Sequence, residues 1–134
     1  MLKKIYDENE RLIALVISSR FYKEGVEFFT PPEFSQQLGY MNHPKGKVIP
    51  AHIHNPVDRN VLATQEVLFI RRGRVLVDLY TAKQTFLASI ELTAGDVILL
   101  AAGGHGLTML EPTEIIEVKQ GPYQGDRDKT VLSL

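Results

Sequence analysis

Residues 65–80, which read QEVLFIRRGRVLVDLY, decide the fold class of this chain. Two apolar runs flank the turn Arg71-Arg72-Gly73-Arg74, and each run has the composition and length of a β-strand. We therefore predict strands at 65–71 and 74–80. Gly73 can adopt a positive φ without steric cost, so the two strands are expected to form a hairpin.

The same signals recur along the rest of the chain, with Gly, Pro or Asn turns about every ten residues. Gly95 marks a second predicted hairpin, and no segment has the period of an amphipathic helix. Such spacing is typical of an all-β sandwich or barrel. The other predicted strands are 11–18, 26–30, 39–42, 48–54, 85–92, 96–100, 106–110 and 113–119.

Length and composition limit the function classes. The 134 residues are 44% hydrophobic, which suits one domain spanning residues 1–134 with one core. The 15 basic and 16 acidic residues give no net field that would favour nucleic acid or an anionic membrane. No apolar run reaches the length of a membrane span, so a cytoplasmic protein is expected. With no cysteine, a metal site here can use only nitrogen and oxygen ligands.

Three of the four histidines lie in two short segments that also contain glycine. His52 and His54 are one residue apart on the predicted strand 48–54, so alternation points both side chains to one face. Glu66 has the parity of Leu68 and Ile70 and is expected to point inward with them. His105 follows two glycines and an apolar run, which makes it the natural fourth ligand.

Three imidazoles and one carboxylate suit one divalent transition metal, and Fe, Mn, Ni, Co, Cu and Zn all remain open. In the simpler alternative, the histidines are hydrogen-bonded core residues and Glu66 pairs with a basic side chain. His43, in a turn-like setting, is assigned to the surface. Arg71, Arg72 and Arg74 are assigned to a solvated tip.

Two segments resemble the motifs of the cupin superfamily. The first, at 46–73, reads Gly46-Lys-Val-Ile-Pro-Ala-His52-Ile-His54, followed by Glu66-Val-Leu-Phe-Ile-Arg-Arg-Gly73. The second, at 95–105, reads Gly95-Asp-Val-Ile-Leu-Leu-Ala-Ala-Gly-Gly-His105. It departs from the family pattern by Ala101 in the proline position, by one missing residue before His105, and by the lack of a downstream Asn.

The resemblance implies a cupin-type antiparallel β-barrel, also called a double-stranded β-helix or jelly roll. It further implies a metal site whose ligands are His52, His54, Glu66 and His105. Eleven residues separate His54 from Glu66 where the family usually has three or four, so the loop 55–65 is the place to look for substrate contacts.

Two functional hypotheses follow from a metal centre of this kind. The first is an isomerase, epimerase or dioxygenase that acts on a small, oxygen-rich, anionic metabolite such as a sugar derivative or a keto acid. Glu66 could instead leave the metal and act as general base. The second hypothesis is a non-catalytic module that binds a metal or a metabolite. The candidate substrate-binding residues are Arg59, Lys47, Tyr40 and Tyr80.

Three further assignments concern the surroundings of the site. Lys119 and Tyr123 stand near a Gly-Pro stop, and either could face the cavity, or neither. The resemblance implies a homodimer formed through sheet edges or exchanged terminal strands. The apolar segment 12–17 would need cover if it lay at an exposed edge.

Overall fold

The computed structural model describes all residues from Met1 to Leu134 and divides them into two compact units. The large unit comprises Met1–Phe21 and Ala63–Leu134, and the small unit comprises Tyr22–Leu62. Apart from one three-residue 3-10 turn, η1 (Gly125–Arg127), all regular elements are strands. No helix has the length and apolar character needed to cross a membrane. The all-β prediction is confirmed.

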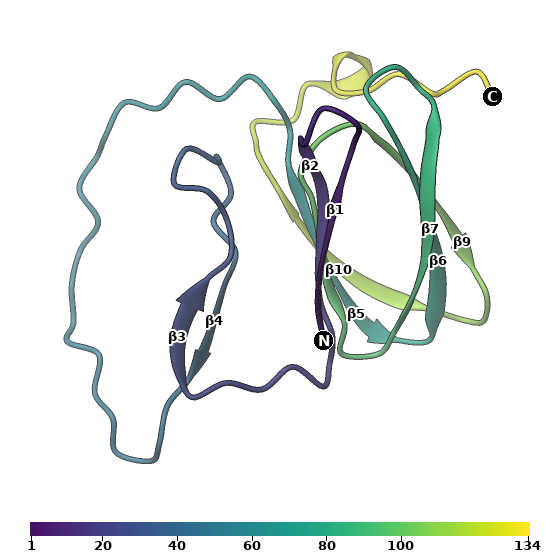
Figure 1. Ribbon diagram of the computed structural model, residues 1–134. Helices are drawn as coiled ribbons and strands as arrows, with labels where there is room; N and C mark the ends of the chain where they lie inside the picture. The colour runs from purple at the N-terminus through teal and green to yellow at the C-terminus, as the bar shows by residue number, and fades with distance from the viewer. The chain divides into compact units, whose positions relative to one another are not determined.

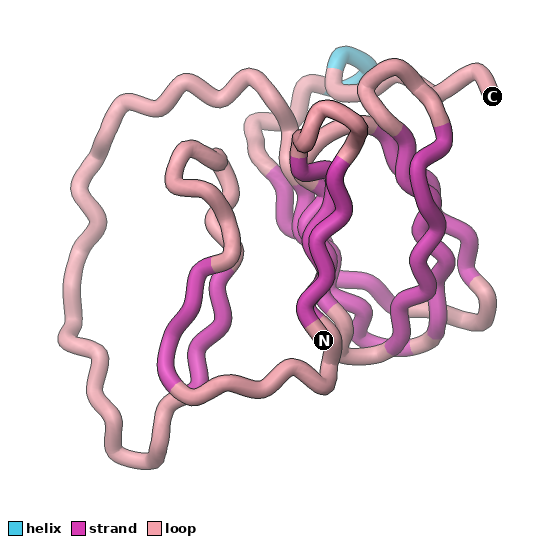
Figure 2. Tube along the Cα trace, viewed as in Figure 1, coloured by secondary structure: helices cyan, strands magenta, loops and turns pink.

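The large unit contains two antiparallel sheets (Figures 1 and 2). Strand order is β1-β2-β8-β5-β10 in the five-stranded sheet and β7-β6-β9 in the three-stranded sheet. These strands are β1 (Leu2–Tyr6), β2 (Leu12–Ile17), β5 (Glu66–Arg72), β6 (Arg74–Tyr80), β7 (Phe86–Thr93), β8 (Val97–Leu100), β9 (Gly104–Met109) and β10 (Glu114–Lys119).

The core of the large unit lies between these two sheets and follows from strand alternation. In β6, Val75, Val77 and Leu79 are fully buried, whereas the residues between them are partly exposed. Leu68 and Ile70 of β5 make up the facing side in the five-stranded sheet. Burying each such side chain stabilises the fold by roughly 1.5–3 kcal/mol, so the two inward faces hold the sheets together.

The small unit contains one antiparallel pair of strands, β3 (Gly25–Phe28) and β4 (Gly39–Asn42). The predicted strand at 48–54 is wrong, because that segment has no regular structure. A strand needs a backbone partner, and within this unit β3 and β4 already pair with each other. Pro50, which has no N–H to donate, further weakens any ladder there.

Gly73 and Gly95 have the positive φ angles predicted for them, 94° and 91°. The hairpins predicted at these glycines are wrong, however. β5 pairs with β8 and β10, while β6 pairs with β7 and β9, so the turn at Gly73 crosses from one sheet to the other. The turn at Gly95 likewise joins β7 to β8 of the other sheet. A turn motif in the sequence determines the local backbone conformation, but it does not determine which strands pair.

β1 was not predicted, because its two lysines hide the period of two and only Ile5 is buried. It pairs with β2, which therefore lies inside the sheet with all six residues buried. The apolar segment 12–17 is thus not an exposed edge. The homodimer stays a prediction, which light scattering would test.

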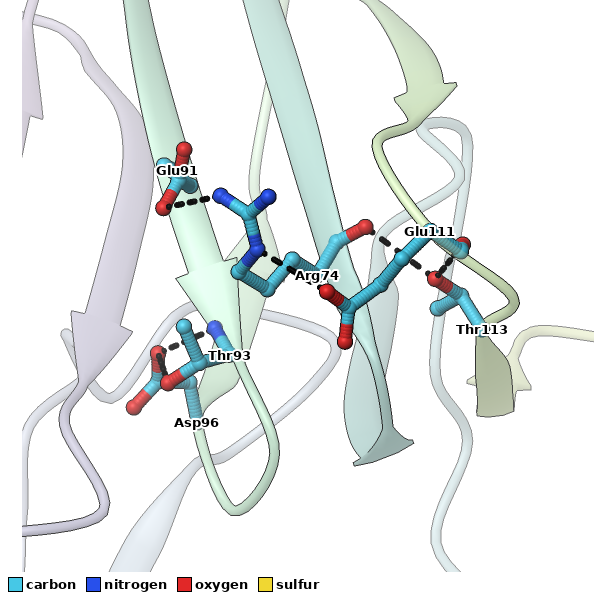
Figure 3. A network of polar contacts seen from close by, with 6 residues as sticks. All are labelled: Arg74, Glu91, Thr93, Asp96, Glu111 and Thr113. Carbon is cyan, nitrogen blue, oxygen red and sulfur yellow. Dashed lines mark hydrogen bonds and ion pairs between the residues drawn. The ribbon is translucent and has the colours of Figure 1, made fainter.

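Polar contacts stabilise the turns at which the chain crosses from one sheet to the other (Figure 3). The buried Asp96 carboxylate accepts backbone N–H bonds from Thr93 and from Ser19, each at 2.8 Å. Arg74 pairs with Glu91 at 3.2 Å and with Glu111 at 3.1 Å. Arg74 is therefore part of an ion-pair network, although its surroundings are solvated as expected.

Candidate metal centre

Glu66 is the first residue of β5 and lies on the inward face of the large unit. Its sheet neighbours on that face, Leu68 and Ile70, are 2% and 0% exposed, which confirms the predicted orientation. In register, Glu66 stands opposite Leu100 on one side and Lys119 on the other. The carboxyl group of Glu66 therefore lies at the edge of the apolar interior, and the Glu66 side chain is 21% exposed.

His105 reaches the same place from the three-stranded sheet. It is the second residue of β9 and pairs in register with the fully buried Leu79, so its ring is on the inward face as well. Its Nε2 lies 3.8 Å from Oε2 of Glu66. The structure thus brings together two of the four predicted ligands, from two different sheets.

Both groups have perturbed proton affinities. Burial raises the pKa of the Glu66 carboxyl, and the charge of Glu117 and a hydrogen bond with it raise that pKa further. The charges of Lys119 and Lys129 act in the opposite direction. Burial also lowers the pKa of the His105 imidazole, against an opposing effect of Glu117. At neutral pH His105 is therefore uncharged, the form in which an imidazole binds a metal.

Glu117 is a site residue that the sequence reasoning missed. It alternates with Ile115 and Lys119 on β10, and its register partner Leu68 is buried. All three therefore share the inward face with Glu66. The parity of Glu117 with Ile115 was the signal that could have identified it. Lys119, whose orientation was left open, lies on this face too.

His52 and His54 belong to the small unit. Alternation along a strand does not explain their proximity, because 48–54 is irregular, yet their ring centroids lie 5.2 Å apart with the planes at 72°. Nδ1 of His52 lies 2.8 Å from the carbonyl oxygen of Pro50. A carbonyl can only accept, so Nδ1 is the donor of this hydrogen bond.

The donor chemistry fits a divalent transition metal, although no three His, Asp or Glu side chains are already grouped around one point. Two ligands about 2.1 Å from one ion lie roughly 3.0–3.4 Å apart. The 3.8 Å separation of Glu66 and His105 would therefore have to shorten by about half an ångström for both groups to bind one ion.

Of the four predicted substrate residues, Tyr80 belongs to the large unit, and Tyr40, Lys47 and Arg59 belong to the small unit. The Tyr80 ring packs edge-to-face on Phe86, 5.9 Å between centroids, on the face of β6 opposite to Leu79. Arg59 is exposed in the irregular part of the small unit and makes no ion pair. Tyr40 pairs in register with Glu27. Lys47 and His43 line a pocket of about 530 Å³. The assignment of His43 to a surface turn is wrong, because the residue precedes the turn and is half-buried, and its Nε2 is buried without a hydrogen-bond partner.

A Glu66→Gln variant is expected to be more stable than the wild type at pH 7. The raised pKa means that the folded chain holds this proton more tightly than the unfolded chain. The carboxyl therefore stabilises the fold fully below the unfolded pKa, near 4.5, and loses that stabilisation as pH rises through its folded pKa. A glutamine side chain does not ionise, so the Glu66→Gln variant does not lose this stabilisation as the pH rises.

Urea unfolding at pH 4.5, 6 and 8 measures this effect, with Glu8→Gln at an exposed turn as the control. The gain in unfolding free energy should grow from pH 4.5 to pH 8 in the Glu66 variant alone. A Glu66→Gln protein that is less stable at pH 8 would show that the carboxylate is a satisfied structural partner.

Comparison of the chain with family models, with curated proteins and with solved structures found no match. The functional assignment therefore depends on the residues and their arrangement alone. Within that arrangement, the inward pair Glu66 and His105 is the feature that calls for a chemical explanation.

Proposed function

We propose that the chain is a metal-dependent enzyme of the cupin type that acts on a small, oxygen-rich, anionic metabolite. The observation that carries the proposal is the approach of Glu66 and His105 to 3.8 Å from different sheets. Both are good metal ligands, and both lie at the boundary between the apolar interior of the large unit and solvent. A purely structural site would more simply have apolar residues there.

The order of the strands supports a jelly-roll fold. β5 lies in the five-stranded sheet, and β6 and β7 lie in the three-stranded sheet. The chain then returns to the five-stranded sheet with β8, crosses again with β9 and returns once more with β10. Repeated crossing between two facing antiparallel sheets is the way a double-stranded β-helix is wound. The positive-φ turns at Gly73 and Gly95 both lie at such crossings.

In this proposal Glu66 and His105 would bind one divalent transition metal, for which the sequence predicts His52 and His54 as further ligands. Fe, Mn, Ni, Co, Cu and Zn all accept such a set. When bound, the ion supplies Lewis acidity, and Fe, Mn or Cu supplies redox chemistry as well. The Nδ1–H bond from His52 to Pro50 supports the ligand role of His52, because it fixes the tautomer.

The protein's own groups have distinct tasks. His105 stays neutral through burial, so no proton competes for its nitrogen at pH 7. Leu68, Leu79 and Leu100 are almost fully buried beside the pair and exclude water from its inner side. Glu66, with its raised pKa, is suited to accept and return a substrate proton whenever it is not held by the ion. An isomerase or epimerase needs such a group, whereas a dioxygenase needs dioxygen as co-substrate and a redox-active metal.

Metal analysis and turnover together test the proposal. Protein purified without a metal-affinity column is expected to contain about one transition metal ion per chain by mass spectrometry. The loaded protein should then convert members of a panel of keto acids, hydroxy acids and sugar phosphates. A non-catalytic module would only raise its melting temperature with a ligand and leave that ligand unchanged. No metal after reconstitution would refute the proposal.

A further inference from the structure

The small unit contains a pocket of about 530 Å³ that the proposed metal centre does not use. A volume of this size is typical of pockets that bind small molecules. All the residues that line the pocket lie between Tyr22 and Lys47, so one unit forms it alone. The pocket therefore offers a binding site whose function does not depend on Glu66, His105 or a metal.

Hydrogen bonds hold the walls of this pocket at one end of the β3–β4 pair. Gly25 and Asn42 are register partners there, and Nδ2 of Asn42 donates to the carbonyl oxygen of Lys23 at 2.9 Å. The turn that follows is closed by the backbone N–H of Lys47, which donates to the carbonyl oxygen of Pro44 at 3.2 Å. The two segments on either side of the pocket are thus fixed by their own backbone contacts.

Two charged side chains of opposite sign line the pocket. Glu24 and Lys47 are exposed there, and neither forms an ion pair with the other or with any other residue. The adjacent charges of Lys23 and Glu27 neutralise each other in an ion pair. One carboxylate and one ammonium that stay apart in the same pocket favour a ligand with both charges over an ion with only one.

His43 adds a polar group that the protein itself does not satisfy. The residue lines the same pocket, and its Nε2 is buried without a hydrogen-bond partner. Such an atom is costly, and few buried polar groups in native proteins lack a partner. This orphaned atom is an observation independent of the two charges, and it too points to a polar ligand.

We propose that the pocket binds a small zwitterion of the amino-acid class, with the ligand carboxylate on Lys47 and the ligand ammonium on Glu24. A lysine ammonium is a compact charge with three donors, and a carboxylate accepts from several N–H groups at once. The sequence predicted Lys47 as a partner for an anionic substrate. The pocket keeps that chemistry for Lys47 and adds a second charge that selects an amine.

The competing explanation is that Glu24 and Lys47 are solvated surface charges beside an open hollow. Exposed charges contribute little to stability, so replacing either one should leave the fold intact under both explanations. The two explanations differ in ligand binding, which makes a binding experiment decisive.

The experiment is calorimetric titration of the full chain with L-alanine, L-glutamate and L-lysine, in a buffer with EDTA so that a bound metal cannot chelate the amino acid. At least one of the three should bind. Propionate and ethylamine, which each carry only one of the two charges, should bind at least about tenfold more weakly. Lys47→Gln and Glu24→Gln should each weaken binding of the preferred amino acid about tenfold, because one charge-assisted contact is lost.

The matched controls are Lys45→Gln and Glu33→Gln, which change exposed residues of the small unit outside the pocket and should leave the affinity unchanged. No binding of the three amino acids up to about 10 mM overturns the proposal. Propionate or ethylamine that binds as tightly as the amino acid overturns it too. So does an affinity that falls equally in the control variants, or that stays unchanged in Lys47→Gln and Glu24→Gln.

Discussion

Replacing His105 with alanine is expected to abolish stoichiometric metal binding. His105 and Glu66 are the two predicted ligands that the structure brings together from different sheets, with 3.8 Å between Nε2 and Oε2. An ion that loses one of its few strong ligands, and the only one from the three-stranded sheet, loses affinity by orders of magnitude. Mass spectrometry of the purified variant should find less than about a tenth of the wild-type metal content.

The matched control is His43→Ala, which removes the one histidine outside the predicted ligand set. It should retain metal, as should the wild type, and circular dichroism should show all proteins folded. A second test is the double variant His52→Ala/His54→Ala, which should lose metal to the same extent as His105→Ala. Full metal content in His105→Ala, or its loss in His43→Ala alone, would contradict the assignment.

Replacing Gly73 with alanine is expected to destabilise the large unit by about 3 kcal/mol, because two costs combine. The backbone at Gly73 has φ 94°, a conformation that L-residues rarely adopt. A Cβ atom there would lie 2.3 Å from the carbonyl oxygen of Pro112 and 2.8 Å from Cα of Thr113. Both contacts are with backbone, so a rotamer change cannot relieve them.

Urea unfolding followed by circular dichroism measures this loss, with Gly106→Ala as the control. Gly106 lies in β9 with an ordinary φ, and nothing would lie within 4 Å of its added Cβ. The control should therefore stay within about 0.5 kcal/mol of the wild type. Equal urea midpoints for Gly73→Ala and Gly106→Ala would show that the backbone at position 73 can adopt another conformation in which both costs are avoided.

The sequence by itself determined the features that depend on neighbouring residues. Alternation identified nine of the strands, among them 39–42 and 74–80 with their observed limits. It also placed Glu66 on the inward face, because parity with Leu68 and Ile70 fixes the side of the sheet. The glycine signals identified the positive φ angles at Gly73 and Gly95, since only glycine takes them freely.

Only the tertiary structure decided which strands pair, because pairing joins segments that are distant in sequence. The residues around Gly73 are as suitable for a hairpin as for a crossing, and the structure uses them to cross between sheets. A partner strand also decided that residues 2–6 are extended and that 48–54 are not. The cluster around Glu66 has the same origin: His105 and Glu117 come to it from β9 and β10, and long-range packing alone sets their distances.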